Sequence, residues 1–365
     1  MRVHVVAPEG FDDPGRPSGG NNYDRRVCAG LAESGWDVRI AAVGGAWPAY
    51  DRAARADLAR VLTAIPDGET VLVDGLVAAP AATPLLSHAR RLRLVVLLHM
   101  PLATAMDHQN DAATKRSERA VLGVVAGVVV TSEWTRREVL ARFAIPGERV
   151  RVARPGVDRA GVAPGDAAGG HLLCVGTVGP HKGQDLLVGA LAGLPGREWE
   201  CALVGPLDRD PDFVAQLRTR IARAGLGARV RLAGTLTGTA LDHAYAAADV
   251  VVVPSRSETY GMVVTEALAH GLPVIAAATG GLPEALGFAD DGHRPGRLVA
   301  PDDPVALRTA LAEWLRDGEL RQHLRAAALR RRARLPGWDQ TVRDLARALT
   351  AAGRHAAPAS GTTAS

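Results

Sequence analysis

Short runs of β-branched and other apolar residues alternate with helical segments along almost the whole chain of 365 residues. Such runs are too short for helices, and their unbroken apolar character is typical of strands buried on both faces of a parallel sheet. The alternation therefore predicts repeated βαβ units. Because a chain of this length exceeds one ordinary core, we expect two α/β domains. The predicted strands are residues 2–6, 38–42, 70–74, 94–98, 127–131 and 150–153 in the first half and 171–175, 200–204, 229–233, 250–253, 273–277 and 297–299 in the second.

The stretch RAGVAPGDAAGG, residues 159–170, separates these halves and shows no periodicity. Its polar composition, rich in glycine, alanine and proline, predicts a linker. We therefore place one domain in residues 1–160 and the other in residues 171–338, followed by a helix in residues 339–353. The tail, residues 354–365, has the composition of a disordered segment.

The composition argues against several classes of function. Aromatic residues make up only 4% of the chain, which argues against a base-stacking surface for nucleic acid. The three cysteines lack the CxxC spacing of metal clusters, and Cys174 and Cys201 lie in apolar strand patterns, so we expect them to be buried. The net charge of +4 fits a protein that binds anionic nucleotides.

The first ten residues, MRVHVVAPEG, read as a strand rather than a signal peptide. The longest apolar run, residues 121–130, is too short to span a bilayer. We therefore expect a soluble, cytoplasmic protein. Arginines gather within residues 330–334 and 90–93, and those at the end of a helix are ordinary partners of the helix dipole. They leave open a weak peripheral contact with membranes, and the oligomeric state has no signal in the sequence.

Two glutamates, Glu258 and Glu266, flank the point where a strand passes into a helix. Residues 250–253 (VVVV) predict the strand, a loop carries Glu258, and helical periodicity runs over residues 262–270. The carboxyl end of such a strand is where open α/β sheets bind ligands. The N–H groups at the helix start suit a phosphate, and a carboxylate on either side can accept hydrogen bonds from sugar hydroxyls. The arrangement favours a nucleotide-sugar site, although two solvated acids would give the same spacing.

The segment that contains both glutamates, PSRSETYGMVVTEALAHGLPVIAAATGG, resembles the Glu-x7-Glu motif of the retaining GT-B glycosyltransferases of family 4 (group 1), which are related to sucrose synthase. The resemblance covers about residues 1–350 and is strongest in residues 171–301. It implies the GT-B fold, an α/β architecture of two Rossmann-like domains facing across a cleft. The first domain would bind the acceptor and the second the donor. By the same resemblance, Glu258 would hold the donor sugar and Glu266 the ribose.

Gly176 and Lys182 lie in the segment VGTVGPHKG, after the first strand of the second half. Glycines there allow a tight turn, and a lysine before a helix can reach a diphosphate. The segment resembles the family's G-R-x-x-x-x-K-G, in which an arginine and the lysine neutralise the leaving diphosphate. Thr177 stands where the family has the arginine, and we consider His181 or Arg256 as the replacement.

Two glycine pairs also match the family pattern. Gly280 and Gly281 begin GGLPE, which resembles the family's G-G-x-x-E segment near the donor, although a plain helix-opening turn explains them almost as well. Gly19 and Gly20 are expected in the loop before a first helix at about residues 21–34. In the family this pair lies near the diphosphate and the acceptor.

His99 follows the buried strand predicted at residues 94–98 and therefore lies at a strand's carboxyl end. A lone histidine is more often structural than catalytic, but the family carries one at a comparable strand end, close to the reacting sugar. The resemblance assigns catalytic roles to His99, Lys182 and Glu258. It assigns donor binding to Gly19, Gly20, Gly176, Thr177, Lys182, Glu258, Tyr260, Gly261, Met262, Val263 and Glu266.

The implied reaction is that of a retaining hexosyltransferase (EC 2.4.1.-), which moves a hexosyl unit from a UDP- or GDP-linked sugar to a hydroxyl. The acceptor would be a small polar natural product, a glycolipid or a glycan. No DxD-type motif is present where a metal would be needed, so we expect neither a metal nor a cofactor beyond the nucleotide-sugar substrate.

Two other classes of function are weighed against this one. The first glycine loop lacks the GxGxxG fingerprint, which argues against NAD-dependent redox chemistry. A catalytically inactive pseudo-glycosyltransferase, acting as a partner subunit, is the main alternative. Thr177 favours it, whereas the presence of Lys182, Glu258 and Glu266 argues for an active enzyme.

Overall fold

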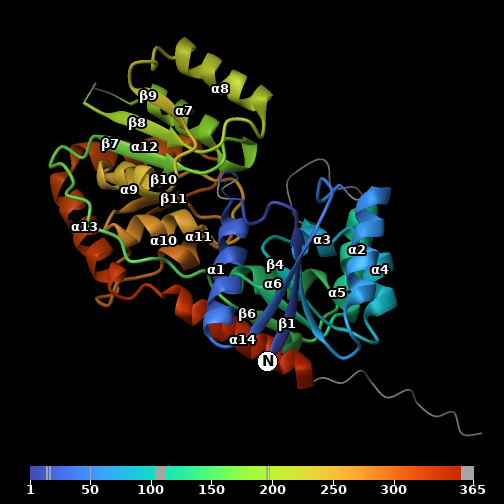
Figure 1. Ribbon diagram of the computed structural model, residues 1–365. Coiled ribbons are helices and arrows are strands. Elements are labelled where there is room, and N and C mark those ends of the chain that lie inside the picture. The colour runs from blue at the N-terminus through green and yellow to red at the C-terminus, as the bar shows by residue number, and fades with distance from the viewer. Residues whose placement is uncertain are drawn as a thin grey trace, which may run out of the picture. The chain divides into compact units, whose positions relative to one another are not determined.

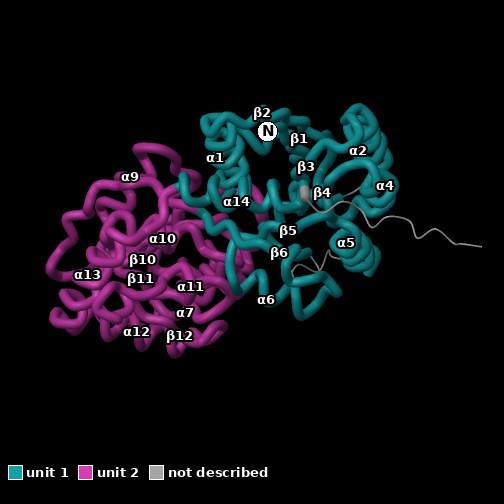
Figure 2. The backbone as a smooth tube through the Cα atoms, turned by 90° about the horizontal axis from the view of Figure 1, so that it is seen from below, with its two compact units in different colours: residues 1–155, 338–365 teal, residues 156–337 magenta. Residues whose placement is uncertain are grey.

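All twelve strands predicted from the sequence form, and they divide into two parallel sheets of six strands each (Figure 1). The structure is a computed structural model that describes residues 1–354 apart from 14, 16–17, 50, 103–111, 195 and 197. Of the predicted tail, residues 354–365, Arg354 is instead the last residue of the final helix, and residues 355–365 lie outside the described residues. The chain forms two compact units, Met1–Pro155 with Trp338–Ser365 and Gly156–Gly337, which Figure 2 colours separately.

Unit 1 is built on a sheet with the strand order β2-β1-β3-β4-β5-β6. Side chains on alternate positions of its strands point to opposite faces, so Val5 and Val95 enter one apolar core and Val6 and Val96 the other. The elements of the unit are β1 (Arg2–Pro8), α1 (Gly19–Glu33), β2 (Asp37–Val43), α2 (Arg52–Ala64), β3 (Thr70–Asp74), α3 (Gly75–Ala78), α4 (Ala82–His88), β4 (Arg93–Leu98), α5 (Ala112–Val124), β5 (Gly127–Val130), α6 (Glu133–Arg142), η2 (Gly147–Arg149), β6 (Val150–Val152) and α14 (Trp338–Arg354).

Helix α14 packs beside α1 in unit 1, although the two come from opposite ends of the chain (Figure 1). The helices approach closely because Gly30 faces Val342, where a Cβ on Gly30 would lie 2.4 Å from the valine Cγ2. Leu345 and Leu349 of α14 complete the apolar core over β1, β3 and β4. The last helix is therefore an integral part of unit 1.

Unit 2 repeats the plan with the strand order β12-β11-β10-β7-β8-β9, again with apolar side chains on both faces. The buried, free thiols of Cys174 and Cys201 confirm that these cysteines serve as core residues. The elements are β7 (His171–Val175), η3 (Pro180–Lys182), α7 (Gln184–Ala192), β8 (Glu200–Val204), α8 (Pro211–Arg223), β9 (Val230–Gly234), α9 (Gly238–Ala246), β10 (Val250–Val253), α10 (Met262–Ala269), β11 (Val274–Ala277), α11 (Leu282–Leu286), β12 (Gly296–Val299), α12 (Pro304–Arg316) and α13 (Gly318–Arg332).

Residues 159–170, predicted as a linker, instead belong to unit 2. Arginines of α13 donate to carbonyl oxygens of this segment, Arg332 to Ala160 at 2.6 Å and Arg325 to Ala163. Asp249 accepts from the backbone N–H of Asp166 at 2.6 Å. The composition gave no sign of these contacts because the partners are more than 80 residues away in the sequence.

The first glycine pair also differs from expectation. Gly19 and Gly20 are the first two residues of α1, not part of the preceding loop. The Ser18 hydroxyl caps this helix by accepting from the backbone N–H of Asn21 at 3.0 Å, so the helix begins two residues earlier than the apolar periodicity indicated.

Candidate functional site

The polar residues of unit 2 gather where the strand order of its sheet reverses. Strand β7 is the first of the unit, and its neighbours are β8 on one side and β10 on the other. In sheets of this kind the crevice for a ligand opens at the carboxyl ends of the two central strands, here β7 and β10. The loop after β7 carries Gly176–Lys182, and the loop after β10 carries Glu258.

Lys182 and Glu258 meet at this point. The lysine Nζ lies 2.5 Å from Oε2 of Glu258, and their side chains are 24% and 16% exposed. The backbones of the two segments approach closely at Gly183, the N-cap of α7. Gly183 has a φ of 69°, and a Cβ there would lie 2.2 Å from the carbonyl oxygen of Pro254. A half-buried ammonium is thus joined to a half-buried carboxylate, and both keep a surface that a ligand can reach.

The second glycine pair forms a seat for the Glu258 loop. The Gly281 N–H donates to the carbonyl oxygen of Glu258 at 2.9 Å. Gly280 has a φ of 57°, and a Cβ there would lie 1.7 Å from the same oxygen. Only glycine leaves room for this approach, so the pair does more than open α11. The glycine pair fixes the position of the backbone at Glu258.

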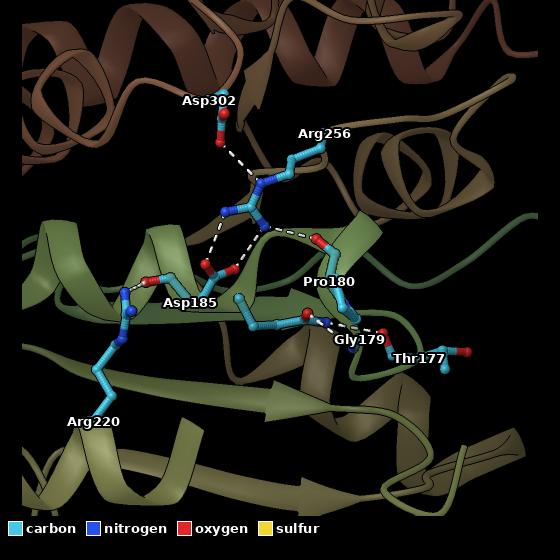
Figure 3. Close-up of polar contacts among 8 residues, drawn as sticks. Thr177, Gly179, Pro180, Asp185, Arg220, Arg256 and Asp302 are labelled. Carbon is cyan, nitrogen blue, oxygen red and sulfur yellow. Dashed lines mark hydrogen bonds and ion pairs between the residues drawn. The ribbon is translucent and has the colours of Figure 1, made fainter. Parts of the chain in front are cut away.

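Arg256 ties the two loops together (Figure 3). Its Nη1 and Nη2 donate to the two carboxylate oxygens of Asp185 at 2.7 and 2.8 Å, its Nε donates to Asp302 at 2.9 Å, and Nη1 also donates to the Pro180 carbonyl at 2.7 Å. Burial by itself would raise the pKa of Asp185, but the hydrogen bonds and charge of Arg256 outweigh it and lower that pKa.

The guanidinium of Arg256 therefore already binds Asp185, Asp302 and the Pro180 carbonyl, which argues against Arg256 as the replacement for the arginine missing at position 177. The carbonyl oxygen of Thr177 instead accepts from the side-chain amide of Gln184 at 3.0 Å, and that amide's oxygen accepts from the Gly179 N–H at 3.3 Å. The loop after β7 is held by neutral hydrogen bonds at this end (Figure 3).

Glu266 is oriented by a residue that has no local signal in the sequence. The Tyr245 hydroxyl, on α9, donates to Oε2 of Glu266 at 2.7 Å. The Tyr245 ring is buried and stacks on His270 with centroids 4.8 Å apart. Burial raises the pKa of Glu266, and the hydrogen bond from Tyr245 opposes that shift. One carboxylate oxygen is thus fixed by the tyrosine.

The predicted donor-binding residues from Tyr260 to Val263 divide into two kinds. The Tyr260 side chain is buried in the apolar core with Val264 and Leu282, so its side chain serves packing. Gly261, with a φ of 91°, starts α10 without a side-chain cap, and Met262 and Val263 form the first turn. This helix N-terminus can meet an anion through backbone N–H groups.

Unit 1 places His99 against two buried acids. Nε2 of His99 lies 2.7 Å from Oδ1 of Asp24, which is on α1, and the nearest polar atoms of His99, Asp24 and Asp74 all lie within 4.8 Å of one another. Gly20 lies beside the ring, since a Cβ there would be 3.3 Å from Cδ2 of His99. The predicted residues Gly20 and His99 are thus neighbours, whereas the sequence gave no pointer to Asp24 or Asp74.

Two family models match the chain. "Glycosyl transferases group 1" matches residues 169–331, and "Glycosyltransferase Family 4" matches residues 71–160. A protein of Catenulispora acidiphila named D-inositol 3-phosphate glycosyltransferase 1 is 32% identical over 291 residues, which is 74% of this chain and 67% of the relative. The chain belongs to the group 1, family 4 glycosyltransferases.

Other family members share less of their length with the chain. A D-inositol 3-phosphate glycosyltransferase of Jonesia denitrificans is 34% identical over 62% of this chain, and the match spans only 57% of that relative. For the corresponding Salinispora tropica protein, which is 33% identical over 66% of this chain, the matched share is 54%. The chain therefore spans a little over half the length of these two curated relatives.

Solved structures confirm the GT-B fold that the resemblance implied. Sucrose-phosphate synthase from Thermosynechococcus elongatus superposes with a TM-score of 0.78 at 22% identity, covering 95% of this chain and 98% of that one. Anabaena Alr3699/HepE, solved in complex with UDP and glucose, gives a TM-score of 0.76 at 19% identity, covering 96% and 99%. Within the part of the chain that the structure describes, no helix combines the length and apolar character needed to cross a membrane.

Proposed function

We propose that this family 4 protein is a retaining hexosyltransferase that uses a nucleotide diphosphosugar and a hydroxyl acceptor. The observation that carries the proposal is the pairing of Lys182 with Glu258 where the strand order of the unit 2 sheet reverses. Glu266 lies on the following helix, α10, where the Tyr245 hydroxyl holds it. These are the residues that a diphosphate, a sugar and a ribose would require in that order.

The chemistry assigns each group a part. The bond between the anomeric carbon and the diphosphate oxygen breaks, and its electron pair leaves with the nucleoside diphosphate. Lys182 and the start of α10 would stabilise that developing negative charge. The acceptor oxygen bonds to the same face of the anomeric carbon, and its proton passes to the departing phosphate. Glu258 would hold sugar hydroxyls rather than form a glycosyl intermediate, and no metal is assigned a part.

For the donor we propose a UDP-linked hexose, with a GDP-linked one second. The UDP and glucose bound to the structural neighbour Alr3699/HepE support the first choice. For the acceptor we propose a small polyol, because several relatives are named for transfer to D-inositol 3-phosphate. The same chemistry would also serve a glycolipid or a glycan as the acceptor.

The test is a panel of UDP-, GDP-, ADP- and TDP-sugars incubated with the purified protein, first with water alone and then with inositol, inositol phosphates and simple glycosides. Proton NMR follows the released nucleotide and the configuration of the new anomeric centre. Transfer or slow hydrolysis of one donor with retained configuration supports the proposal. Inverted product, or no turnover and no nucleotide binding across the panel, contradicts it and favours the inactive partner subunit.

Lys182 offers a sharp internal control because the chain has only one other lysine, Lys115. Lys115 is exposed on α5 in unit 1. Lys182→Ala should lower kcat by about 100-fold, the typical loss when one charge-stabilising donor is removed. Lys115→Ala should leave kcat unchanged. Equal activity of the two variants would remove Lys182 from the mechanism.

A further inference from the structure

His99 is held by a buried pair of acids that the proposed donor chemistry does not use. Asp24 and Asp74 are only 3% and 6% exposed, whereas the His99 side chain is 21% exposed. Asp24 comes from the second turn of α1, and Asp74 closes β3 and caps α3 by accepting from the Leu76 N–H at 2.6 Å. The acids are therefore enclosed, and of the three side chains the imidazole is the most accessible to a ligand.

Protonation of one carboxyl group lowers the net negative charge of this cluster. Burial, together with the nearby Asp24 carboxylate, raises the pKa of Asp74 to about 8, so this carboxyl is largely protonated at neutral pH. Burial by itself would lower the pKa of His99, but Asp24 and Asp74 outweigh it and raise that pKa. Two carboxyl groups so close together share one negative charge, and the imidazole faces that charge through Nε2.

We propose that Asp24 and Asp74 are positioning residues for His99, which bind its Nε2–H and so present Nδ1 as the ring nitrogen that meets the reactants. In this arrangement the protonated Asp74 donates to Asp24, and Asp24 accepts from Nε2 of His99. Among the described residues, no partner faces Nδ1. The part that Nδ1 plays in the reaction rests on the proposed function, but the arrangement of protons does not.

The hydrogen bond to Asp24 selects the orientation of the ring, because a ring turned by 180° would present Cε1 to the carboxylate. Gly20 approaches one edge, where even a Cβ would lie 3.3 Å from Cδ2 of His99. Tyr23 lies across the ring at a centroid distance of 5.2 Å and an interplanar angle of 77°, and its hydroxyl donates to the Ala153 carbonyl at 2.9 Å. The first two turns of α1 thus supply a glycine, an aromatic ring and a carboxylate to one imidazole.

The tautomer can be measured directly. Long-range proton–nitrogen NMR of the wild-type protein distinguishes a protonated Nε2 from a protonated Nδ1, and His99→Gln identifies the His99 signals among the 11 histidines. We expect Nε2 to stay protonated as the pH rises and Nδ1 to titrate. A neutral His99 with its proton on Nδ1, or a shift of its signals on addition of Zn²⁺ or Mn²⁺, would overturn the proposal.

Two substitutions of the acids give opposite expectations. Asp74→Asn keeps a donor toward Asp24 and should preserve the Nε2–H form at every pH. Asp24→Asn removes the negative charge and can turn an amide donor toward Nε2, so the His99 titration should move to lower pH and the Nδ1–H form should appear. Asp67→Asn, at an exposed acid of the same unit, is the control and should change neither. If Asp24→Asn leaves the His99 titration where it is, the acids do not position the ring.

Activity then shows whether the position matters for transfer. Asp24→Asn should lower kcat by about 100-fold, as expected when a reacting group is misplaced, while KM for the donor stays the same. Asp74→Asn should keep wild-type kcat near neutral pH and lose any fall in kcat near pH 8 that the wild type shows. Unchanged kcat in Asp24→Asn would refute the positioning role. If the wild type itself transfers no sugar, the proposed function fails, while the NMR result still decides the proton arrangement.

Discussion

The two units place polar groups at the same edge of the same kind of sheet, yet they hold them in different ways. In unit 2, Lys182 and Glu258 lie on loops and remain partly exposed, and backbone contacts at Gly183 and Gly280 fix where those loops run. In unit 1, His99 is fixed by two side chains that are almost fully buried. Unit 2 thus leaves charged side chains partly exposed on loops with a fixed backbone, whereas unit 1 buries its two acids and leaves one imidazole ring partly exposed.

The difference fits the roles proposed for the two units. A diphosphate carries full charges, so its site must offer charged groups without burying them beyond reach, and a rigid backbone sets their position. A single imidazole has two distinct nitrogens, so its orientation and tautomer must be chosen, and buried acids are suited to that task. The comparison can be tested by substitutions that alter the backbone in unit 2 and by substitutions that alter the protonation of the buried acids in unit 1.

The largest effect should come from Gly280→Ala. A Cβ at this position would lie 1.7 Å from the Glu258 carbonyl oxygen, and the φ of 57° is unfavourable for alanine. We expect unit 2 to lose about 4 kcal/mol or more of stability and donor binding to be abolished. Calorimetry and nucleotide titration measure the two effects.

Gly292→Ala is the matched control, because Gly292 also has a positive φ, 79°, but no heavy atom within 4 Å of its Cβ direction. It should cost only about 1 kcal/mol, the strain of the backbone alone. Similar losses in both variants would show that the seat for the Glu258 loop is not specific.

Asp74→Asn should produce the next largest effect, and it depends on pH. Because the pKa of Asp74 is raised to about 8 in the folded chain, the native state holds this proton more tightly than the unfolded chain does. Stability should therefore be complete below about pH 4 and fall as the pH rises toward 8. Asparagine does not titrate, so the stability of Asp74→Asn should not fall in this way. Between pH 5 and pH 8 the free energy of unfolding of the wild type should decrease by on the order of 3 kcal/mol relative to that of Asp74→Asn.

Urea denaturation at the two pH values measures this difference. The charge-neutral comparison is Asp67→Asn, whose curve should stay parallel to the wild type because Asp67 is exposed and its exposed ion pair with Arg91 contributes little. A pH dependence shared by Asp74→Asn and the wild type would mean that Asp74 is not the protonated acid of the cluster.

Local pattern predicted the fold and the placement of the residues proposed for donor binding, because both depend on short segments. Unbroken apolar runs such as residues 250–253 located all the strands, and Gly176, Lys182 and Glu258 each lie in a segment that connects a strand to the next α-helix. Since the carboxyl ends of parallel strands meet at one edge, residues that follow different strands can be expected to come together. The pairing of Lys182 with Glu258 across 76 residues follows from that rule.

The supporting residues could not be predicted, because their partners are set by tertiary packing. Asp24 lies inside a helix 75 residues before His99, and Tyr245 lies in an apolar helix 21 residues before Glu266. Nothing in a helical pattern distinguishes a buried acid with a partner from a solvated one. The linker prediction at residues 159–170 was wrong for the same reason, since the arginines that bind it are on α13.

Arg256→Lys should have a smaller effect on unit 2. Lysine keeps the charge but loses the two-pronged contact with Asp185 and the separate contact with Asp302. Since Arg256 and Asp185 are about one-fifth exposed, we expect a loss of about 2 kcal/mol. Thermal unfolding should show it, with Arg218→Lys on the exposed face of α8 as the control. Equal melting temperatures for the two variants would show that Arg256 does not tie the loops.

The smallest effect should come from Tyr245→Phe, which removes one hydroxyl and leaves the buried ring and its stacking on His270 in place. The lost hydrogen bond should cost about 1 kcal/mol of stability. Without that donor the pKa of Glu266 should rise further, because burial then acts unopposed. Donor affinity should therefore weaken several-fold and begin to fall at a higher pH than in the wild type, as calorimetric titration across pH 5–8 would show.

Because Tyr245 contacts Glu266 and not the Lys182–Glu258 pair, kcat at saturating donor should hardly change. A drop in kcat with unchanged affinity would mean that Glu266 acts on the reacting sugar rather than on the ribose.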